Sequence, residues 1–386
     1  MIPRHIVSAD SHVVEPADLW VTRVDKRFTD RAPQVRGDPE KAGLATLYVD
    51  GLRMMAISAV GAAGRSGQEL KEFEQSAGYE QFHRGAYDPT ERIKAQEEDG
   101  VEAEVLYTSL GMPLFGLKDA ELQRECFRAY NDWLAEYCSH SPKRLIGTAL
   151  ITLADIPAAV AELQRTRKAG LRGAQIWGST PAEFPTYDSP VYDPFWQAAC
   201  DLDVPLSLHI GTGGSRSPAM TLMKGLSKLE ENSPGLGRVS VYVYLGADIQ
   251  QSLFVLSATG VLERFPRLRI VSAENDIGWM PHFLYRLDHA WNKYHAIGSA
   301  KKLSMTPAEF IRRQVWATFQ DDPVGPATYK FYGEDKYMWA SDFPHGDCTW
   351  PNSKKVIAED FAGVPDNVTA KIVCDNAVKL YGLDLN

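Results

Sequence analysis

The sequence has few cysteines, and no two of them lie close together along the chain. The five in its 386 residues, Cys126, Cys138, Cys200, Cys348 and Cys374, are widely spaced, and no CxxC motif occurs. A disulfide framework or a thiolate zinc site needs paired or clustered cysteines. We therefore expect neither, and we expect the cysteines within helical patterns to be buried as small apolar residues.

Long apolar runs and an excess of basic residues are also missing. No stretch approaches the roughly 20 apolar residues of a membrane-spanning helix, and the first residues lack the layout of a secretion signal. The formal net charge of −9 argues against a nucleic-acid partner. With 44% hydrophobic and 24% charged residues, the composition is globular. We expect a cytoplasmic protein that acts on a small molecule.

Short apolar segments recur along the chain and alternate with helical patterns. The predicted strands are residues 5–10, 101–109, 144–152, 172–178, 204–211, 268–275, 315–319 and 336–344. Most are apolar on both faces, which is typical of a parallel sheet covered on both sides. Eight such strands favour an α/β fold, a closed (β/α)8 TIM barrel, over an open doubly wound sheet. Helices are predicted at 89–99, 119–139, 155–168, 195–202, 250–263 and 279–294.

Residues 16–87 interrupt this alternation. They are rich in Gly, Arg and Glu and show no sustained period, so we interpret them as an insertion after strand one that forms a lid or an interface. One elaborated barrel accounts for the whole length, and we predict a single domain over residues 1–386. The Gly-, Ser- and Pro-rich loop 211–237 is expected over the barrel mouth, where specificity resides.

Carboxylates and imidazoles stand at the ends of four predicted strands. Asp10 and His12 follow strand one with the two-residue spacing that puts both side chains on one face. His209 ends strand five, and Asp342 ends strand eight. Strand ends converge at the carboxyl face of a barrel, and these groups without thiolate suit a first-row divalent metal. A polar pocket without metal is the alternative for the four residues together.

Three further residues extend the candidate ligand set. Glu274 ends strand six, Glu15 follows His12 by three positions, and His345 follows Asp342 by three. Seven candidates exceed what one ion with open positions needs, so one or two ions are expected, with Glu274 or Glu15 bridging or binding the second. The alternative for Glu15 is an acidic residue in a first helical turn. For His345 the alternative is a hydrogen bond that supports a ligand.

Residues for substrate binding are less specific. Trp177 and Tyr107 lie at other strand ends and are candidates for the pocket wall. Arg216, and also Arg312 and Arg313, offer guanidinium groups that clamp a carboxylate, although a surface charge is the simpler interpretation of each.

Several segments together resemble a known family. They are DSHVVEPADLW, YNDWLAEYC, VYDPFW, His209, ERFPRLRIVSAENDIGWMP and MWASDFPH. With them nearly the whole chain resembles the amidohydrolase-related family that includes aminocarboxymuconate semialdehyde decarboxylase and other non-oxidative decarboxylases. The resemblance implies a divalent metal bound at Asp10, His12, His209 and Asp342, with Asp342 able to orient or deprotonate a metal-bound water. It also implies a homodimer.

One departure from this family keeps several activities open. The decarboxylases carry a histidine after strand six, where this chain has Asn275 preceded by Glu274. The first hypothesis is hydrolysis or decarboxylation of a small carboxylate, acyl or amide substrate, with Asp342, His209 and Glu274 as catalytic residues. The second is a nonheme monooxygenase with two irons or iron and manganese, and the third is a non-catalytic barrel subunit. Iron, manganese and zinc are the candidate metals.

Overall fold

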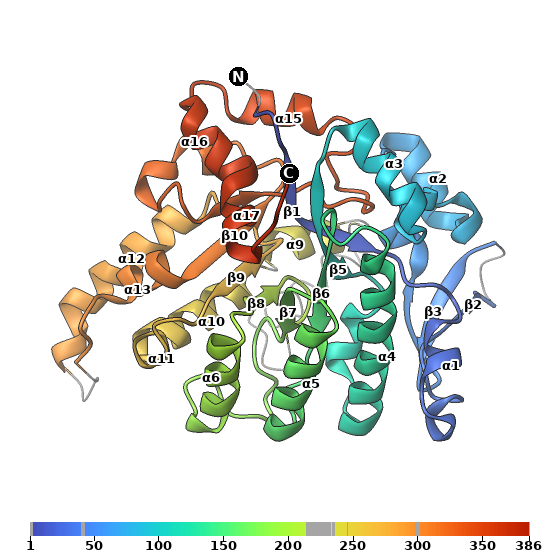
Figure 1. Ribbon diagram of the computed structural model, residues 1–386, viewed down its shortest axis with the longest axis horizontal. Helices are drawn as coiled ribbons and strands as arrows, with labels where there is room; N and C mark the ends of the chain where they lie inside the picture. Colours follow the sequence, from blue (N-terminus) through green and yellow to red (C-terminus); the bar gives the residue numbers. More distant parts are fainter. Residues whose placement is uncertain are drawn as a thin grey trace.

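Eight parallel strands form the centre of the protein in a computed structural model (Figure 1), which describes residues 3–39, 43–213, 233, 236–244, 246–297 and 302–385. The strands lie side by side in chain order. They are β1 (Val7–Val13), β5 (Ala103–Thr108), β6 (Leu145–Leu150), β7 (Gly173–Ile176), β8 (Leu206–His209), β9 (Ile270–Ala273), β10 (Val315–Phe319) and β11 (Tyr337–Trp339). Each overlaps a strand predicted from the sequence, and the TIM-barrel prediction is confirmed.

The chain after β11 closes the barrel against β1. The N–H of Asp342 donates to the carbonyl of Asp10 at 3.0 Å, and the N–H of His12 donates to the carbonyl of Phe343 at 2.7 Å. Buried serine hydroxyls bond to one another across the same junction, and they belong to Ser8, Ser11 and Ser341. We call this junction the closing seam, and it rules out the open doubly wound sheet.

Helices surround the strands, and their starts follow from capping residues. Asp88 accepts the N–H groups of Thr90 and Glu91 at the start of α3, which satisfies donors that a helix start leaves free. The helix ends at Gly100, whose φ of 77° suits glycine. The barrel helices are α3 (Pro89–Asp99), α4 (Ala120–Ser139), α5 (Ile156–Lys168), α6 (Asp193–Asp201), α9 (Leu236–Tyr244), α10 (Ala247–Ala258), α11 (Val261–Arg264), α12 (Met280–Tyr294), α13 (Pro307–Gln314), α14 (Val324–Ala327), α15 (Ser353–Asp360), α16 (Asp366–Ala370) and α17 (Asn376–Tyr381).

Two sequence predictions need correction here. The helix expected at 250–263 is divided into α10 and α11, because Gly260 adopts a φ of 83° between them. The first strand does not end at Asp10 but continues to Val13, so both Asp10 and His12 lie within it. Most of the 211–237 loop, including Arg216, lies outside the described residues.

The segment 16–87 has a sheet of its own, which its sequence did not predict. Three antiparallel strands pair in the order β2-β3-β4. The elements are α1 (Leu19–Arg23), β2 (Gln34–Gly37), β3 (Ala45–Val49), β4 (Leu52–Ala56) and α2 (Gly67–Ser76). The segment lies beside α3 and α4 (Figure 1), and its apolar residues join the barrel's main core cluster. Its role as a lid stays a prediction.

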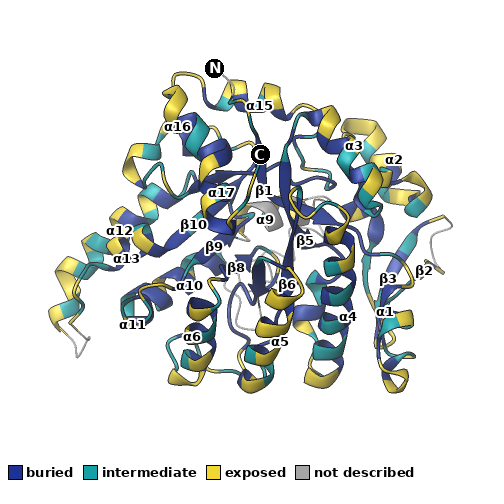
Figure 2. Ribbon diagram, viewed as in Figure 1, coloured by how far each residue is buried: buried dark blue, intermediate teal, exposed yellow. Residues whose placement is uncertain are grey.

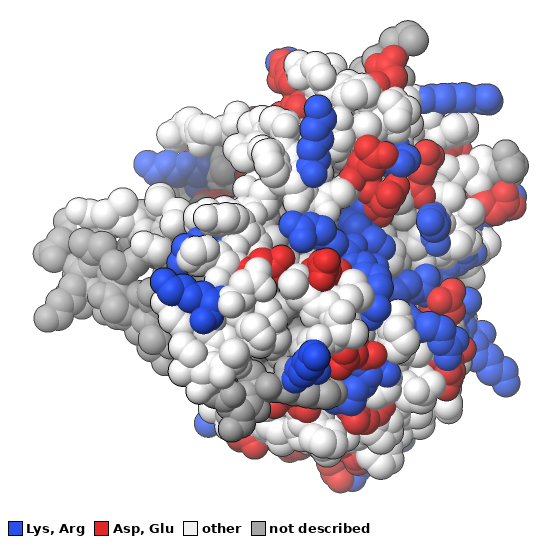
Figure 3. Space-filling model, turned by 90° about the vertical axis from the view of Figure 1, so that its left-hand side faces the viewer, with Lys and Arg blue, Asp and Glu red and all other residues white. Residues whose placement is uncertain are grey.

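Burial follows the barrel arrangement. The central strands are buried, and the helices expose the sides that face away from them (Figure 2). On the face seen in Figure 3, basic and acidic side chains lie close to one another. Among the described residues no helix is both long enough and apolar enough to cross a membrane.

Replacing Asn131 with Leu should destabilise the barrel. Its buried amide accepts the N–H of Leu150 at 2.7 Å and donates to the Leu150 carbonyl at 3.0 Å, so it pairs the backbone at the end of β6. The substitution leaves these backbone groups without partners, and we expect a loss of about 3 kcal/mol in urea unfolding. Gln197→Leu on the exposed face of α6 is the control, with a change within about 0.5 kcal/mol. Equal effects of the two variants would contradict the prediction.

Candidate metal centre

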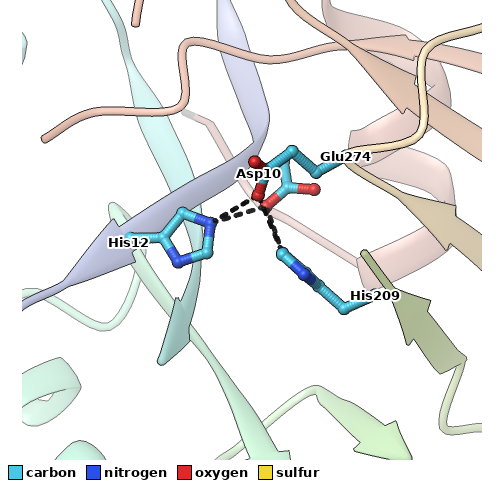
Figure 4. Close-up of side chains that lie close together, drawn as sticks. All are labelled: Asp10, His12, His209 and Glu274. Carbon is cyan, nitrogen blue, oxygen red and sulfur yellow. Dashed lines mark ion pairs between the residues drawn. The ribbon is translucent and has the colours of Figure 1, made fainter. Parts of the chain in front are cut away.

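Four side chains converge at the carboxyl end of the barrel (Figure 4). Asp10 and His12 come from β1, His209 ends β8, and Glu274 follows β9. The Glu274 Oε2 atom lies 3.3 Å from Nε2 of both histidines, and Asp10 Oδ1 lies 3.6 Å from the same two nitrogens. We call these residues the first ligand group. One potential ligand atom from each lies within 4.8 Å of all the others.

A second ligand group overlaps the first. It contains His12, Glu274, Asp342 and His345. Asp342 Oδ1 lies 3.3 Å from His12 Nε2 and 3.1 Å from His345 Nδ1. The His345 Nε2 atom pairs with the hydroxyl of Ser109 at 3.0 Å. Six of the seven predicted ligand candidates therefore meet in one place.

Backbone carbonyls orient the two histidines of the first group. The Nδ1–H of His12 donates to the carbonyl of Thr108 at 2.8 Å, and the Nδ1–H of His209 donates to the carbonyl of Ile210 at 2.9 Å. These bonds direct both Nε2 atoms at the cluster, which is how metal-binding imidazoles are usually held.

The carboxylates are fixed in a similar way. The hydroxyl of Thr318 donates to Asp10 Oδ2 at 2.8 Å and accepts the N–H of Glu274 at 2.7 Å. Glu274 and Asp342 both adopt positive φ values, 53° and 57°. Such values cost energy in residues other than glycine and recur at functional sites. The chain therefore turns sharply just after β9 and near the end of β11.

The donor set fits a divalent cation. Six buried atoms of the cluster have no hydrogen-bond partner among the described residues: Asp10 Oδ1, His12 Nε2, His209 Nε2, Glu274 Oε2 and both carboxylate oxygens of Asp342. Buried polar atoms rarely lack partners, and these six are oxygen and imidazole nitrogen atoms of the kind that first-row metals bind. Bound cations would supply the partners that these atoms lack.

The pKa shifts also indicate a need for positive charge. Burial and then repulsion by Asp342 raise the pKa of Glu274 to about 8, and burial and then Asp10 raise the pKa of Asp342 well above its usual range. Burial, His345 and His209 lower the pKa of His12. Burial would lower the pKa of His209, but the carboxylate of Asp10 at 3.6 Å, and then that of Glu274, raise it to about 9. A metal ion would offset the repulsion between the carboxylates.

Glu15 does not join either group, in contrast to its prediction as a ligand. Its carboxylate accepts the hydroxyl of Thr108 and the N–H groups of Leu110, at 2.8 Å, and Gly111, at 3.3 Å. Glu15 is completely buried. Burial raises its pKa, although these hydrogen bonds by themselves would lower it. It holds the loop after β5, next to the carbonyl that orients His12.

A cavity of roughly 500 Å³ adjoins the cluster through Glu274. Apolar side chains of Ile210, Val243, Tyr244 and Trp279 line part of it. Its polar lining residues are Gln250, Glu274, Asn275, Asp276, Gln320 and Asp347, and two small residues, Gly246 and Ala247, complete it. Its size is typical of a site for a small molecule, and none of its described lining residues is basic.

Tyr107 and Trp177, two of the residues predicted to contact substrate, do not line this cavity. Both are buried. The Tyr107 ring packs against His209, and the Tyr107 hydroxyl pairs with that of Ser207 at 2.8 Å inside the barrel. The Trp177 ring packs on Phe184. A strand end specifies a residue's height in the barrel but not the direction of its side chain. Arg312 and Arg313 lie on α13 and donate to the carbonyls of Phe331 and Leu262, respectively.

The sequence prediction missed most of the cavity wall. Gln320 directly follows β10, so the strand-end rule would have found it. Trp279 is four residues beyond Asn275 and donates to its carbonyl at 2.6 Å. Val243 and Tyr244 come from α9, whose sequence has no feature that places it at the site.

Comparisons with known proteins agree with this geometry. The amidohydrolase family model matches residues 87–383. A gamma-resorcylate decarboxylase of Rhodococcus jostii is 32% identical over 320 residues, covering 76% of this chain and 87% of the relative. An amidohydrolase structure from Mycobacterium avium subsp. paratuberculosis has a TM-score of 0.79 at 21% identity, with 98% of both chains covered.

A second similar structure contains a metal. It is a dihydroxybenzoic acid decarboxylase from Polaromonas sp. with bound manganese and the inhibitor 2-nitroresorcinol, at a TM-score of 0.68 and 19% identity. The alignment covers 98% of this chain and 97% of that one. The matched family model spans most of the sequence, and the chain therefore belongs to the amidohydrolase family.

Proposed function

We propose that this enzyme is a metal-dependent, non-oxidative decarboxylase of a small hydroxylated aromatic carboxylate. The observation that carries this proposal is that the ligand cluster adjoins a cavity through Glu274. The described walls of this cavity are apolar or uncharged, and their only charged groups are carboxylates. The decarboxylases among its relatives support the reaction class. In the reaction the bond between ring and carboxylate breaks, carbon dioxide leaves, and the ring carbon takes up one proton.

The absence of basic side chains from the described cavity wall supports a role for the metal in substrate binding. A substrate carboxylate beside Glu274 would be repelled without a compensating positive charge. A divalent ion held by the ligand cluster supplies that charge and polarises the oxygens it contacts. The manganese in the Polaromonas decarboxylase structure makes manganese our first candidate metal.

The carboxyl groups of the cluster are the candidates for proton transfer. Glu274 is the ligand candidate that lines the cavity, and its side chain is 20% exposed. Asp342 lies deeper, with 1% of its side chain exposed. We assign to Glu274 the contact with the reacting carbon, and to Asp342 the role of keeping its neighbours His12 and His345 in place. His209, at 3.3 Å, holds the Glu274 carboxylate in position.

The cavity wall suits a flat ring with polar substituents. Trp279 and Tyr244 provide aromatic surface, and the amides of Gln250 and Gln320 provide donors and acceptors for hydroxyl groups. The Asn275 NH2 group donates to the carbonyls of Ala273 and Leu208, which leaves its amide oxygen as an acceptor. The relatives favour decarboxylation over the oxygenase alternative. The homodimer and the cytoplasmic location stay predictions.

The two ligand groups support a second metal ion. An imidazole Nε2 has one lone pair, so His12 cannot bind two ions through that atom. Asp10, His12 and His209 of the first group would hold one ion, and Asp342 and His345 would hold another, which leaves Glu274 able to carry the proton that it is assigned to transfer.

The number of metal ions bound per chain should show whether both positions are occupied. We expect two manganese ions per chain, and one in His345→Ala, because that variant removes a ligand from the second position only. The measurement is elemental analysis after manganese loading and desalting. His289→Ala, on α12 away from the cluster, is the control and should keep two. One ion in both the unmodified protein and His345→Ala would contradict the second site.

Activity should depend on Glu274. Incubation with 2,6-dihydroxybenzoate and manganese without oxygen should release carbon dioxide, and Glu274→Gln should lower kcat at least 100-fold because it removes the proton donor. Glu136→Gln, which changes a carboxylate in a surface ion pair with Arg23, should stay within about twofold. A panel of hydroxybenzoates should be tested with and without oxygen. Turnover that strictly required oxygen would overturn the decarboxylase proposal.

Trp279 should determine affinity for the ring. Trp279→Ala removes aromatic surface from the cavity wall, and we expect KM to rise about tenfold with kcat little changed. Trp279→Phe keeps a ring but loses the hydrogen bond to Asn275, so it should raise KM by a smaller factor. An unchanged KM in both variants would place the substrate elsewhere.

A further inference from the structure

Arg92 is a completely buried arginine outside the ligand cluster. It lies on α3, and its guanidinium passes to the closing seam. Nη1 donates to the carbonyl of His12 at 2.7 Å and to that of Gly85 at 3.3 Å, and Nη2 donates to the carbonyl of Phe343 at 3.4 Å. The guanidinium carbon also lies 4.6 Å from the centre of the Phe343 ring.

These carbonyls belong to both sides of the closing seam. His12 is a ligand candidate on β1, and Phe343 directly follows the ligand candidate Asp342 near the end of β11. The Phe343 carbonyl also accepts the N–H of His12 at 2.7 Å. One planar guanidinium therefore joins the backbone at His12 to the backbone at Phe343, next to Asp342. These two segments come from opposite ends of the sequence. A fork of fixed donors suits this geometry better than a single ammonium.

The positive charge of Arg92 is compensated by Glu104. Arg92 Nε donates to Glu104 Oε2 at 2.5 Å, and Gln96 donates to the same oxygen at 2.7 Å. Burial by itself would lower the pKa of Arg92, but attraction to Glu104 raises it above its usual value. A buried ion pair adds little stability compared with well-packed apolar residues. Its retention here calls for a role in geometry.

We propose that Arg92 is a positioning residue that sets the metal affinity of the cluster by holding His12 and Asp342 together across the closing seam. It bonds to the carbonyls of His12 and of Phe343, the residue after Asp342, and it does not line the cavity. The inference rests on the proposed function only in that the cluster binds a metal ion.

Substitution of Arg92 by Lys tests this role. Arg92→Lys keeps the charge opposite Glu104, but its single nitrogen cannot reproduce the fork in which three nitrogens bond Glu104, the His12 carbonyl and the Phe343 carbonyl separately. We expect the Kd for Mn²⁺, measured by electron paramagnetic resonance without substrate, to rise on the order of 10- to 100-fold. The control is Arg144→Lys, because Arg144 bonds the carbonyls of Glu102 and Val101 just before β5. It should leave the Kd within about twofold.

A double variant separates positioning from folding. Arg92→Met with Glu104→Met removes the charge pair together, and thermal unfolding of the metal-free proteins shows whether each variant is folded. Weaker Mn²⁺ binding in a folded Arg92→Lys variant, or in the folded double variant, supports the inference. Wild-type affinity in a folded variant overturns it but leaves the proposed function intact. If the unmodified protein binds no Mn²⁺, both the inference and the metal-dependent function fail.

Discussion

The closing seam is the junction on which the metal centre depends. A barrel closes only if its last strand meets its first, and here two backbone hydrogen bonds make that contact at ligand positions. The bonds between Asp342 and Asp10, and between His12 and Phe343, join the backbone that carries three ligand candidates. Closure of the fold and assembly of the site are therefore one event. Neither half of the chain contains the cluster by itself.

The site is also a concentration of buried charge that the fold must tolerate. Asp10, Asp342 and Glu274 lie together around three imidazoles, and burial, with repulsion between the carboxylates second, raises the pKa values of Asp342 and Glu274. Positive φ values at Glu274 and Asp342 add backbone strain. The Thr318 hydroxyl donates to Asp10, and ring N–H groups of His12 and His209 donate to backbone carbonyls, which fixes the orientation of these groups. The arrangement is one that a bound cation stabilises, because it supplies the missing opposite charge.

The sequence predicted those parts of the protein that follow from periodicity. Eight apolar segments and the carboxyl-end rule were enough for the barrel and for the convergence of Asp10, His12, His209 and Asp342. Glu15 was misjudged because its carboxylate bonds to backbone N–H groups, which no residue spacing reveals.

Other features depend on contacts far apart in the chain. Tyr107 points into the barrel because side chains alternate between the faces of a strand, and a shift of one residue reverses the direction. The role of Arg92 depends on carbonyls 80 and 251 positions away. The sheet of β2, β3 and β4 is made of short strands, whose pattern is too brief to recognise.

Part of the cavity wall comes from a different kind of element than the metal ligands. The ligands belong to β1 and to the ends of β8, β9 and β11, whereas Val243 and Tyr244 belong to α9, which contributes no ligand candidate. Substitutions in α9 can therefore accumulate without disturbing the cluster. Descendants of one ancestral barrel could acquire new substrates by varying this helix, while the inherited reaction chemistry stays the same.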